Sequence, residues 1–418
     1  MKNKDGGSPD SQTEKSRIVT IRFDGKNDRN KDETAIVVKD GAAKRTKKKK
    51  PKKRRMILLA LALLAVAFIY LNWDALSPQS IGQTFGDVFS GFEKSRYPVM
   101  LSQGNFIGAV PVGQNLGVLT DTSFLIYSST GKPLAERQHG MSSPSVISSG
   151  NKAMIYDRGG KQYKVETRYS EVYSGQTDYP IITAAVSKSG YFALVTESDN
   201  YLSEILVYNQ NGVNVFKYYS AEGRVLSVAL SPDGSRIAAV TVGAKNGDIQ
   251  STVKIYKTSG RNEISSKSYD GLLLFSIGFK GNDRITAIGD TASIFLHNDG
   301  SSISRYDYQD KTLKCYSNTP WTTALVFSKY GVGSDSTVTS FGANGDVAGQ
   351  TDIHSDVKSV YAGNKMVVAL TQRGIWHSDT SLKNSATTNV SGDMIHTISI
   401  QNDVYIFGLQ AVYQYKES

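Results

Sequence analysis

Cysteine is almost absent from this sequence of 418 residues, because Cys315 is the only one. A single cysteine excludes an intramolecular disulfide framework and a zinc site built on several thiolates. Histidine is rare as well, and the five histidines show no HxH or HExxH spacing. Phosphate-loop and dinucleotide-binding fingerprints are also missing, as is a GxSxG elbow in the C-terminal region. We therefore expect no catalytic site, no metal and no cofactor.

The net positive charge is confined to one part of the chain. The formal net charge is +10, yet residues 1–55 hold 19 Lys and Arg against 8 Asp and Glu, while the remaining residues hold 29 against 30. The basic net charge of the whole chain thus says nothing about what residues 56–418 bind. A tail of this composition cannot bury enough apolar surface to fold, so we predict that residues 1–55 are disordered and cytoplasmic. Two β-branched runs, 17–23 and 34–38, could dock on a partner as strands.

One long apolar run follows the tail, at residues 56–73. At about 1.5 Å per residue its 18 residues nearly cross the ~30 Å hydrocarbon layer, which predicts one transmembrane helix. Ten of the twelve residues in 44–55 are basic, and the next basic residue after the run is Lys94. The N-terminus is therefore expected inside and the C-terminal domain outside the membrane. A cleaved signal peptide is the alternative, and Pro78 after the small residues 75–77 disfavours it.

The basic run before this helix has three candidate roles: fixing the topology, attracting anionic lipid and binding nucleic acid. It contains no aromatic stacking groups, so we expect no nucleic-acid partner. After the helix, residues 74–96 form a stem with apolar side chains at helical spacing, which indicates a short amphipathic helix. The residues expected to set the topology and face lipid are Lys47, Lys48, Lys49, Lys50, Lys52, Lys53, Arg54 and Arg55.

From about residue 97 the pattern changes to short apolar runs separated by turn residues, which is typical of an all-β domain. A hairpin recurs in which an aromatic residue ends a strand and a glycine follows four positions later. That glycine is expected to supply the positive φ of a tight turn. The pairs are Tyr127 with Gly131, Tyr208 with Gly212, Tyr256 with Gly260, and Phe341 with Gly345.

A second element, two apolar strands joined by a turn, precedes each hairpin; in the sixth unit it is assigned to residues 323–335. The combined unit occurs eight times at a spacing of about 37 to 48 residues, the range of four-stranded propeller blades. The last unit ends after its third strand, and an unassigned strand at 97–103 precedes the first. We expect that strand to close the ring as the outer strand of the last blade. The predicted fold is an eight-bladed β-propeller over 97–418, with seven blades as the alternative.

The blade pattern, with Ser231-Pro232-Asp233-Gly234 in a first turn and the aromatic-to-glycine hairpin after it, resembles that of WD40-like and quinoprotein-like bacterial propellers. With the basic tail and single helix, residues 44–418 resemble a family of membrane-anchored propeller proteins of unknown function in Gram-positive bacteria. No Trp-Asp dipeptide ends a strand, and only Trp321 and Trp376 lie in the propeller region. The Trp-rich docking repeats of quinoprotein enzymes are thus missing, so the resemblance implies no pyrroloquinoline quinone.

Candidate functional residues within the blades are few. His297 and His377 are expected at equivalent places in third strands, where they would replace the repeat aromatic. Cys315 is expected in a buried strand, without a base beside it. The Asp-containing turns near residues 196, 231 and 280 fit ordinary turn chemistry better than calcium loops. Loop tyrosines could line a recognition face; these are Tyr169, Tyr173, Tyr179, Tyr201, Tyr218 and Tyr219.

These features favour a non-catalytic binding or scaffold module, anchored outside the cytoplasmic membrane, for a protein, peptide or cell-envelope polymer. An extracytoplasmic enzyme of the quinoprotein or glycosidase type is one alternative, and it predicts carboxylates or cofactor ligands converging in the central channel. A transmembrane sensor that couples the propeller to the tail is the other.

Overall fold

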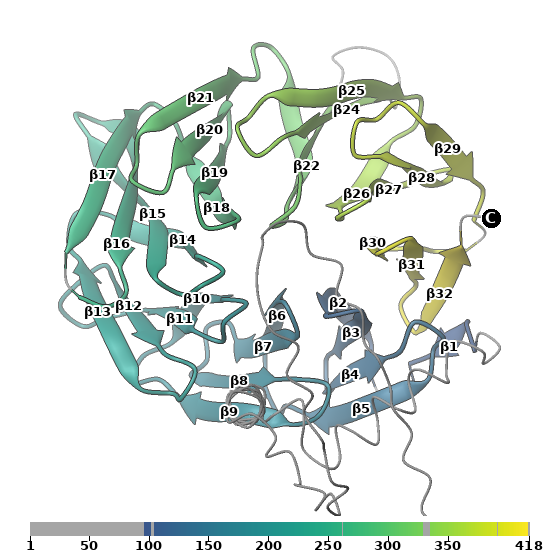
Figure 1. Ribbon diagram of the computed structural model, residues 1–418, viewed down its shortest axis with the longest axis horizontal. Coiled ribbons are helices and arrows are strands. Elements are labelled where there is room, and N and C mark those ends of the chain that lie inside the picture. Colours follow the sequence, from purple (N-terminus) through teal and green to yellow (C-terminus); the bar gives the residue numbers. More distant parts are fainter. Residues whose placement is uncertain (1–95, 102–103, 261, 329–334, 391, 417–418) are drawn as a thin grey trace, which may run out of the picture. The chain divides into compact units, whose positions relative to one another are not determined.

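A computed structural model of the chain describes residues 96–101, 104–260, 262–328, 335–390 and 392–416. These residues form 32 strands in eight sheets of four antiparallel strands. The sheets surround a common centre, and the innermost strands are β2, β6, β10, β14, β18, β22, β26 and β30 (Figure 1). The predicted all-β, eight-bladed propeller with four-stranded blades is confirmed, and the seven-bladed alternative is wrong.

Blades 1 to 4 follow one another along the chain. Blade 1 contains β2 (Phe106–Val112), β3 (Asn115–Thr120), β4 (Ser123–Tyr127) and β5 (Pro133–Gln138). Blade 2 contains β6 (Pro144–Ser149), β7 (Lys152–Asp157), β8 (Gln162–Glu166) and β9 (Glu171–Gln176). Blade 3 contains β10 (Ile181–Val186), β11 (Phe192–Thr196), β12 (Ser203–Tyr208) and β13 (Asn214–Ser220). Blade 4 contains β14 (Arg224–Leu230), β15 (Arg236–Lys245), β16 (Asp248–Lys257) and β17 (Glu263–Asp270).

Blades 5 to 8 complete the ring. Blade 5 contains β18 (Leu274–Lys280), β19 (Arg284–Gly289), β20 (Ala292–His297) and β21 (Ser302–Asp307). Blade 6 contains β22 (Thr312–Asn318), β23 (Thr323–Ser328), β24 (Ser336–Phe341) and β25 (Val347–Ile353). Blade 7 contains β26 (Val357–Ala362), β27 (Met366–Thr371), β28 (Gly374–Asp379) and β29 (Ser385–Thr388). Blade 8 contains β30 (His396–Ile400), β31 (Asp403–Phe407), β32 (Ala411–Lys416) and β1 (Val99–Met100).

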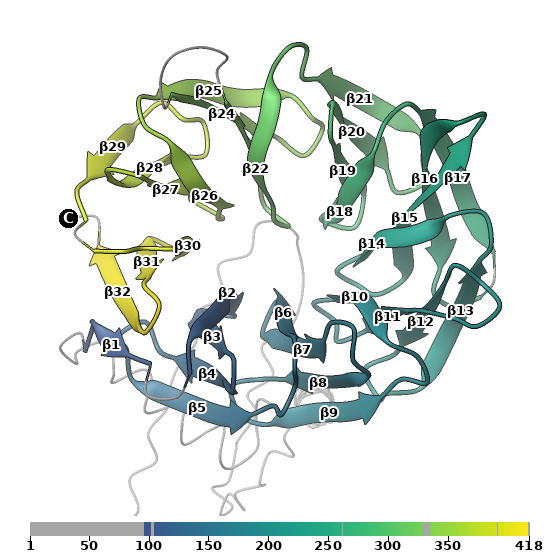
Figure 2. The ribbon, with the colours of Figure 1, turned by 180° about the vertical axis from the view of Figure 1, so that it is seen from behind.

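The ring is closed by the first described strand. β1 pairs antiparallel with β32, with Val99 opposite Val412 and Met100 opposite Ala411. Both ribbon views show this N-terminal strand on the outside of the last blade (Figure 2). Blade 8 therefore takes three strands from the C-terminal end of the chain and one from before blade 1, as the sequence predicted.

Burial explains why strands at different depths have different sequences. Second and third strands such as β3, β4 and β11 are buried along nearly their whole length, because they lie between two neighbouring blades. They consist of almost uninterrupted apolar or small residues. Outer strands such as β5 and β21 alternate between partly buried and exposed positions, and they carry the charged residues.

The core consists of eight separate apolar clusters, one at each interface between adjacent blades of the described ring. The cluster between blades 8 and 1 joins residues from opposite ends of the propeller, including Leu116, Tyr127, Tyr405 and Phe407. Each blade thus buries its apolar faces only against its two neighbours, so closing the ring also buries the faces that an open array would expose.

The aromatic residue of each recurring hairpin packs against the preceding blade. Tyr256 lies 5.3 Å from Phe216 of blade 3, and Phe341 lies 5.6 Å from Phe295 of blade 5, measured between ring centroids. The hairpin glycines Gly131, Gly212 and Gly345 have φ values of 81°, 72° and 81°. A Cβ atom at Gly212 or Gly345 would also overlap a ring of the preceding blade. These glycines therefore serve both the turn and the blade interface.

Gly260 departs from this pattern. Its φ lies outside the positive region, and a Cβ atom there would meet no atom within 4 Å. The expectation that all four glycines supply a positive φ is therefore wrong at this position. In the shorter hairpin of blade 5, Gly300 takes the left-handed conformation, with φ 84°.

The sixth blade differs from its predicted boundaries. Residues 323–328 form β23, the second strand, while the first strand is β22, which contains Cys315. Assigning 323–335 to the first pair of strands was therefore wrong. Polar and charged residues of β22, which reads TLKCYSN, alternate with the others and hide the apolar signal of an innermost strand.

The predicted tail (1–55), transmembrane helix (56–73) and stem (74–96) lie outside the described residues, apart from Arg96. The basic residues expected to face lipid lie there too. Within the described part of the chain, no helix has the length and apolar character needed to cross a membrane.

Candidate functional site

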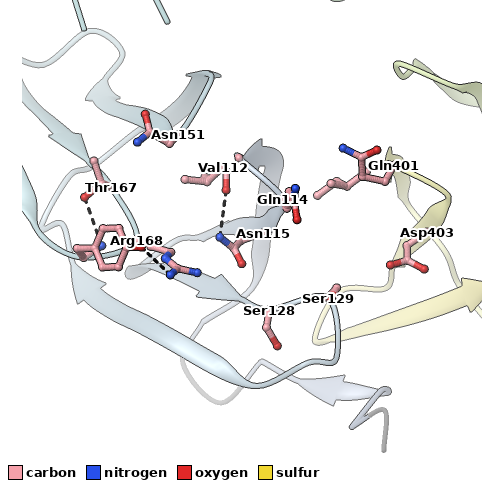
Figure 3. A pocket seen from close by; sticks show the side chains of 13 residues that line it. Val112, Gln114, Asn115, Ser128, Ser129, Asn151, Thr167, Arg168, Gln401 and Asp403 are labelled. Carbon is pink, nitrogen blue, oxygen red and sulfur yellow. Dashed lines mark hydrogen bonds between the residues drawn. The ribbon is translucent and has the colours of Figure 1, made fainter. Parts of the chain in front are cut away.

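A polar cavity of about 500 Å³ opens where blades 8, 1 and 2 meet. Its walls are turns on one face of the propeller: those that join first to second strands and those that join third to fourth strands. We call this cavity the polar pocket. Asn115 and Ser128 lie in its middle in Figure 3, with Arg168 on one side and Gln401 and Asp403 on the other.

Blade 1 contributes the turn between β2 and β3. Gly113 takes a φ of 65°, which lets the chain reverse, and its amide donates a hydrogen bond to the Gly150 carbonyl of blade 2 at 2.7 Å. The Asn115 amide donates to the Val112 carbonyl at 3.3 Å, as drawn in Figure 3. Local hydrogen bonds and a contact with the next blade therefore hold this wall of the pocket.

Blade 2 contributes the turn after β8, which contains Thr167, Arg168 and Tyr169. The Thr167 hydroxyl accepts a hydrogen bond from the Tyr169 amide at 3.3 Å and donates one to the Ser170 carbonyl at 3.2 Å. The Arg168 guanidinium lies 4.5 Å from the centre of the Tyr169 ring and donates to its hydroxyl at 2.6 Å. Arginine and tyrosine are thus held together at the rim of the pocket.

A buried ion pair lies directly behind this turn. Arg137 of β5 donates to the Glu166 carboxylate at 2.8 Å, and Glu166 is almost fully buried. Burial raises the pKa of Glu166, while the hydrogen bond and charge of Arg137 act in the opposite direction. Arg137 also donates to the Thr167 carbonyl at 3.2 Å. The pair therefore fixes the turn of blade 2 to the outer strand of blade 1.

Blade 8 and the ring-closing segment complete the pocket. Gln401, in the turn between β30 and β31, has a φ of 59°, a value rare for a residue with a side chain. The turn Ser128–Ser129 of blade 1 is contacted from blade 8, because Gln414 donates to the Ser129 carbonyl at 2.8 Å. Tyr97 donates to the Ser128 carbonyl at 3.3 Å. The pocket thus lies at the closure of the ring.

Amide and hydroxyl groups dominate the lining of the pocket. Among the described residues that line it, only Arg168 and Asp403 are charged, and they have opposite signs. Such groups can donate and accept hydrogen bonds to an uncharged polar ligand, whereas they supply no pair of carboxylates and no nucleophile with an adjacent base. Across the described ranges, no group of three or more His, Cys, Asp and Glu could hold a metal ion. The arrangement therefore fits binding.

The innermost strands, which surround the centre of the ring, carry no carboxylate. All eight lie within the described residues, and their sequences contain neither Asp nor Glu. They do contain the cations Arg224, Lys280, Lys314 and Lys358. These strands thus offer no carboxylate pair of the kind that a glycosidase would use.

The histidines singled out in the sequence are not equivalent. His297 pairs with Arg284, the first residue of its neighbouring strand, whereas His377 pairs with Val368, the third. His377 thus corresponds to Phe295, and its buried ring lies 5.5 Å from Tyr415 of blade 8. The predicted equivalence was wrong because the hairpin of blade 7 places Leu382, with φ 56°, where blade 5 has Gly300.

Cys315 lies on a strand, and Asp233 lies in a turn that its own side chain stabilises. Cys315 lies half-buried on β22, and burial raises the pKa of its thiol to about 11. Asp233 accepts hydrogen bonds from the Ser231 hydroxyl and from the Ser235 amide and hydroxyl. Burial alone would raise the pKa of Asp233, but these hydrogen bonds outweigh it and leave the pKa below its usual value. The Asp233 turn is therefore stabilised by its own side chains.

The candidate tyrosines lie in three places. Tyr169 lines the polar pocket, and Tyr179 donates a hydrogen bond to Asp199 at 2.7 Å. Tyr173, Tyr218 and Tyr219 lie in outer strands and not in loops. A second cavity, of about 410 Å³, has walls formed by Tyr201, Tyr218 and Tyr219 with Phe216, Lys217 and Tyr256. The sequence thus indicated that tyrosines could form a binding surface, but it did not indicate that Tyr218 and Tyr219 lie in an outer strand.

Sequence reasoning missed the polar pocket itself. Its residues lie in turns of three blades that are far apart in the chain, and they are ordinary turn residues: Gly, Asn, Gln, Ser and Thr. The one signal in the sequence that could have found the pocket is that these turns occupy equivalent positions in adjacent repeats, which places them on the same face of the propeller. The sequence also gave no sign of Lys280, whose buried amine donates to the Asn318 side-chain oxygen at 2.9 Å and to the Thr319 carbonyl.

The fold and the polar pocket together define an eight-bladed β-propeller with a polar cavity at its ring closure. The chain belongs to a family of unknown function (DUF5711), whose sequence profile matches residues 99–414. No curated protein matches the chain.

Solved structures that resemble this chain are distant from it in sequence. Sqt1 from Saccharomyces cerevisiae is 10% identical, with a TM-score of 0.56, over 78% of this chain and 99% of that one. BamB from Moraxella catarrhalis is 12% identical, with a TM-score of 0.47, over 77% of this chain and 99% of that one. The propeller domain of Cps50 (Swd1) from Myceliophteria thermophila is 9% identical, with a TM-score of 0.47, over 67% and 96%. At these identities the likeness concerns the fold alone.

Proposed function

We propose that this protein is a non-catalytic binding module, held outside the cytoplasmic membrane by its N-terminal helix, that recognises an uncharged polar polymer of the cell envelope. The observation that carries the proposal is the lining of the polar pocket by amides and hydroxyls from three blades. Saccharide hydroxyls and peptide amides both match such a lining, because each donates and accepts hydrogen bonds. The membrane location rests on the apolar run at 56–73 and on the basic residues before it.

The full chain, solubilised in detergent, should retain soluble fragments of isolated cell-wall polymer. Asn115→Ala and Gln401→Ala each remove an amide from the pocket, and each should weaken retention about tenfold, or about 1.4 kcal/mol. Asn211→Ala is the matched control, because it removes an amide from an exposed turn of blade 3. If cell-wall fragments are not retained, or if all three variants retain them equally, the pocket is not the binding site.

A transmembrane sensor is a second candidate function, and one observation favours it. The ring-closing segment contacts the same turn that lines the pocket: the Arg96 amide donates to the Thr130 carbonyl at 2.8 Å, and Tyr97 donates to Ser128. This segment directly follows the predicted stem. A ligand that contacts this turn would therefore also affect the ring-closing segment, which is the part of the propeller that follows the predicted anchor and stem along the chain. Hydrogen exchange of the amides in 96–101 should slow on ligand binding, and unchanged exchange would argue against the sensor.

A further inference from the structure

The outer edge of blade 3 differs from the other outer edges of the ring. Each blade ends in an outer strand that has a neighbour on one side only, and charged side chains commonly keep such edges from pairing with other chains. β5, β9, β17, β21 and β25 each contain at least one Asp or Glu. β13, with the sequence NVFKYYS, contains none. Its one charged residue is Lys217, which is paired with Glu204 of β12, so this edge carries no unpaired charge within the described residues.

The second cavity follows this edge. Four consecutive residues of β13, from Phe216 to Tyr219, line it, together with Tyr201 and Tyr256. Successive side chains of a strand point to opposite faces of the sheet. A cavity lined by four consecutive residues therefore cannot lie on one face alone, and must run along the edge of the strand.

Aromatic rings line both sides of the edge. On the side of blade 4, Tyr218 lies 5.0 Å from Tyr256 between ring centroids. On the other side, Tyr219 lies 4.7 Å from Tyr201, and each of these two residues is 43% exposed. Tyr256 is buried and its hydroxyl donates to Glu263. The exposed aromatic surface is therefore formed by Tyr201 and Tyr219 on one side and by the partly exposed Tyr218 on the other.

The one cation on this edge is already neutralised. Lys217 forms an ion pair with the buried carboxylate of Glu204, and its amine lies 5.0 Å from the centre of the Tyr219 ring. The hydrogen bond to Glu204 is the main cause that raises the pKa of Lys217. At the blade 4 wall, the Lys254 amine lies 5.8 Å from the centre of the Tyr218 ring and 4.0 Å from the Glu263 carboxylate, so these two charges are paired with each other. Among the described residues, the edge therefore presents backbone groups between two aromatic walls whose charges are paired.

We propose that an extended segment of a partner protein pairs with the outer edge of β13 as a fifth strand of blade 3. Backbone hydrogen bonds would hold the segment, and its side chains would alternate between the two aromatic walls. Because both walls are aromatic, the segment requires about four consecutive uncharged, apolar side chains, and not the polar-apolar alternation of an ordinary edge strand. Proline is excluded where an N–H must pair with β13.

Random seven-residue peptides displayed on phage, selected against the full chain in detergent, test this inference. We expect enrichment of peptides with at least four consecutive uncharged apolar residues. A synthetic copy of the most enriched peptide should lose at least tenfold in affinity when alternate backbone nitrogens are methylated, because methylation removes the donors that pair with the edge. Fluorescence anisotropy measures the affinity.

Variants of the chain locate the binding site. Tyr219→Lys adds a cation to the edge opposite Glu204, which lies in register with Tyr219 on β12, and should weaken the same peptide at least tenfold. Tyr201→Ser removes a ring from outside the strand and should weaken it as well. Tyr413→Lys is the matched control, because Tyr413 is 37% exposed on a strand of blade 8, and it should leave the affinity unchanged. Circular dichroism checks that each variant is folded.

Three results would overturn the inference. One is the absence of enriched peptides. Another is an enriched peptide that binds Tyr201→Ser and folded Tyr219→Lys as tightly as the unchanged chain, or that tolerates methylation. The third is self-association of the chain that Tyr219→Lys abolishes, since the occupant of the edge would then be a second copy of this chain. None of these results depends on the polar pocket.

Discussion

The interfaces on the two sides of blade 5 are filled in different ways. Fourteen buried apolar residues form the cluster between blades 4 and 5, and Phe279 is its only aromatic residue. The cluster between blades 5 and 6 has six, of which four are aromatic: Phe295, Tyr308, Phe327 and Phe341. The rings make specific contacts there; Tyr308 meets Phe327 at 5.0 Å and an interplanar angle of 63°. The same four-stranded blade can therefore pack against its neighbours through many aliphatic side chains on one side and through a few aromatic rings on the other.

The inner ends of the two interfaces differ as well. β18 approaches β22 less closely than it approaches β14. Near the end of β18, the Lys280 amine donates hydrogen bonds to Asn318 and Thr319 of blade 6, and the Asn318 amide donates to the Thr286 carbonyl at 3.3 Å. Side-chain hydrogen bonds thus connect the inner ends of blades 5 and 6, whereas aliphatic side chains make most of the contacts between blades 4 and 5. Buried polar groups and large rings allow less adjustment than aliphatic packing, so the interface between blades 5 and 6 should be the more sensitive to substitution.

Alanine at the hairpin glycines should show the largest difference between the two interfaces. A Cβ atom at Gly345 would overlap the buried ring of Phe295 and the Ser304 hydroxyl. One at Gly300 would instead overlap the hydroxyl and Cβ of Ser265, which lies on the outer strand β17 and is only partly buried. Their φ values of 81° and 84° are nearly the same, so the backbone strain of about 1–2 kcal/mol is common to both. Gly345→Ala should cost about 1–3 kcal/mol more, because the Phe295 ring is held on all sides in the buried interface, whereas the outer strand that carries Ser265 has a neighbour on one side only and can shift. The midpoint of urea denaturation measures this difference, and equal losses would show that the rings adjust as easily as the serine.

The second prediction concerns the pH dependence of stability at the interface between blades 5 and 6. Burial lowers the pKa of Lys280 from 10.5 to about 7, and within the described part of the chain no carboxylate forms an ion pair with it. Between pH 7 and the unfolded pKa, the unfolded chain binds the proton that the folded chain has released. Stability should therefore rise with pH, by up to about 1.4 kcal/mol per unit, and below pH 7 this contribution should be constant.

Urea denaturation between pH 7 and 8 should detect this rise, since over that range the tyrosines are protonated in both states and the Cys315 thiol is mostly protonated in both states. Lys280→Met keeps the apolar stem and removes the titrating amine, so the rise should disappear. Lys254→Met is the control, because Lys254 belongs to blade 4 and lies 4.0 Å from the Glu263 carboxylate. If the variant at Lys280 keeps the slope of the unchanged chain, another group causes the pH dependence.

These two interfaces also show which features of the fold could be predicted from the sequence and which could not. Alternating apolar runs, turn residues and the aromatic-to-glycine hairpin predicted eight four-stranded blades and the closing strand, because each blade repeats the same local pattern. The pattern does not say which partner a side chain meets. Phe295 and Lys280 look like ordinary strand residues, and their roles arise only when blade 6 is placed beside blade 5.

The candidate site was less accessible to sequence reasoning for the same reason. The polar pocket combines turns of blades 8, 1 and 2, and Gln401 lies almost 300 residues from Asn115 in the chain. Turn residues such as Asn and Ser occur wherever a turn is needed, so composition alone cannot separate a pocket wall from a plain turn. The tyrosines of β13 were noticed for their chemistry, yet the sequence did not reveal that they lie on both sides of one edge.

The smallest predicted effect concerns a single hydroxyl within the aromatic interface. Tyr308 and Ser293 share a buried hydrogen bond of 2.7 Å, whereas the hydroxyl of the neighbouring Tyr306 makes none within the described residues. Tyr308→Phe should lower the free energy of unfolding by about 1 kcal/mol, because it removes that bond and keeps the ring. Tyr306→Phe should change it by less than about 0.5 kcal/mol, as is usual for a substitution that removes no contact. Equal losses in the two variants would mean that the rings alone, without the hydrogen bond, account for the stability of this interface.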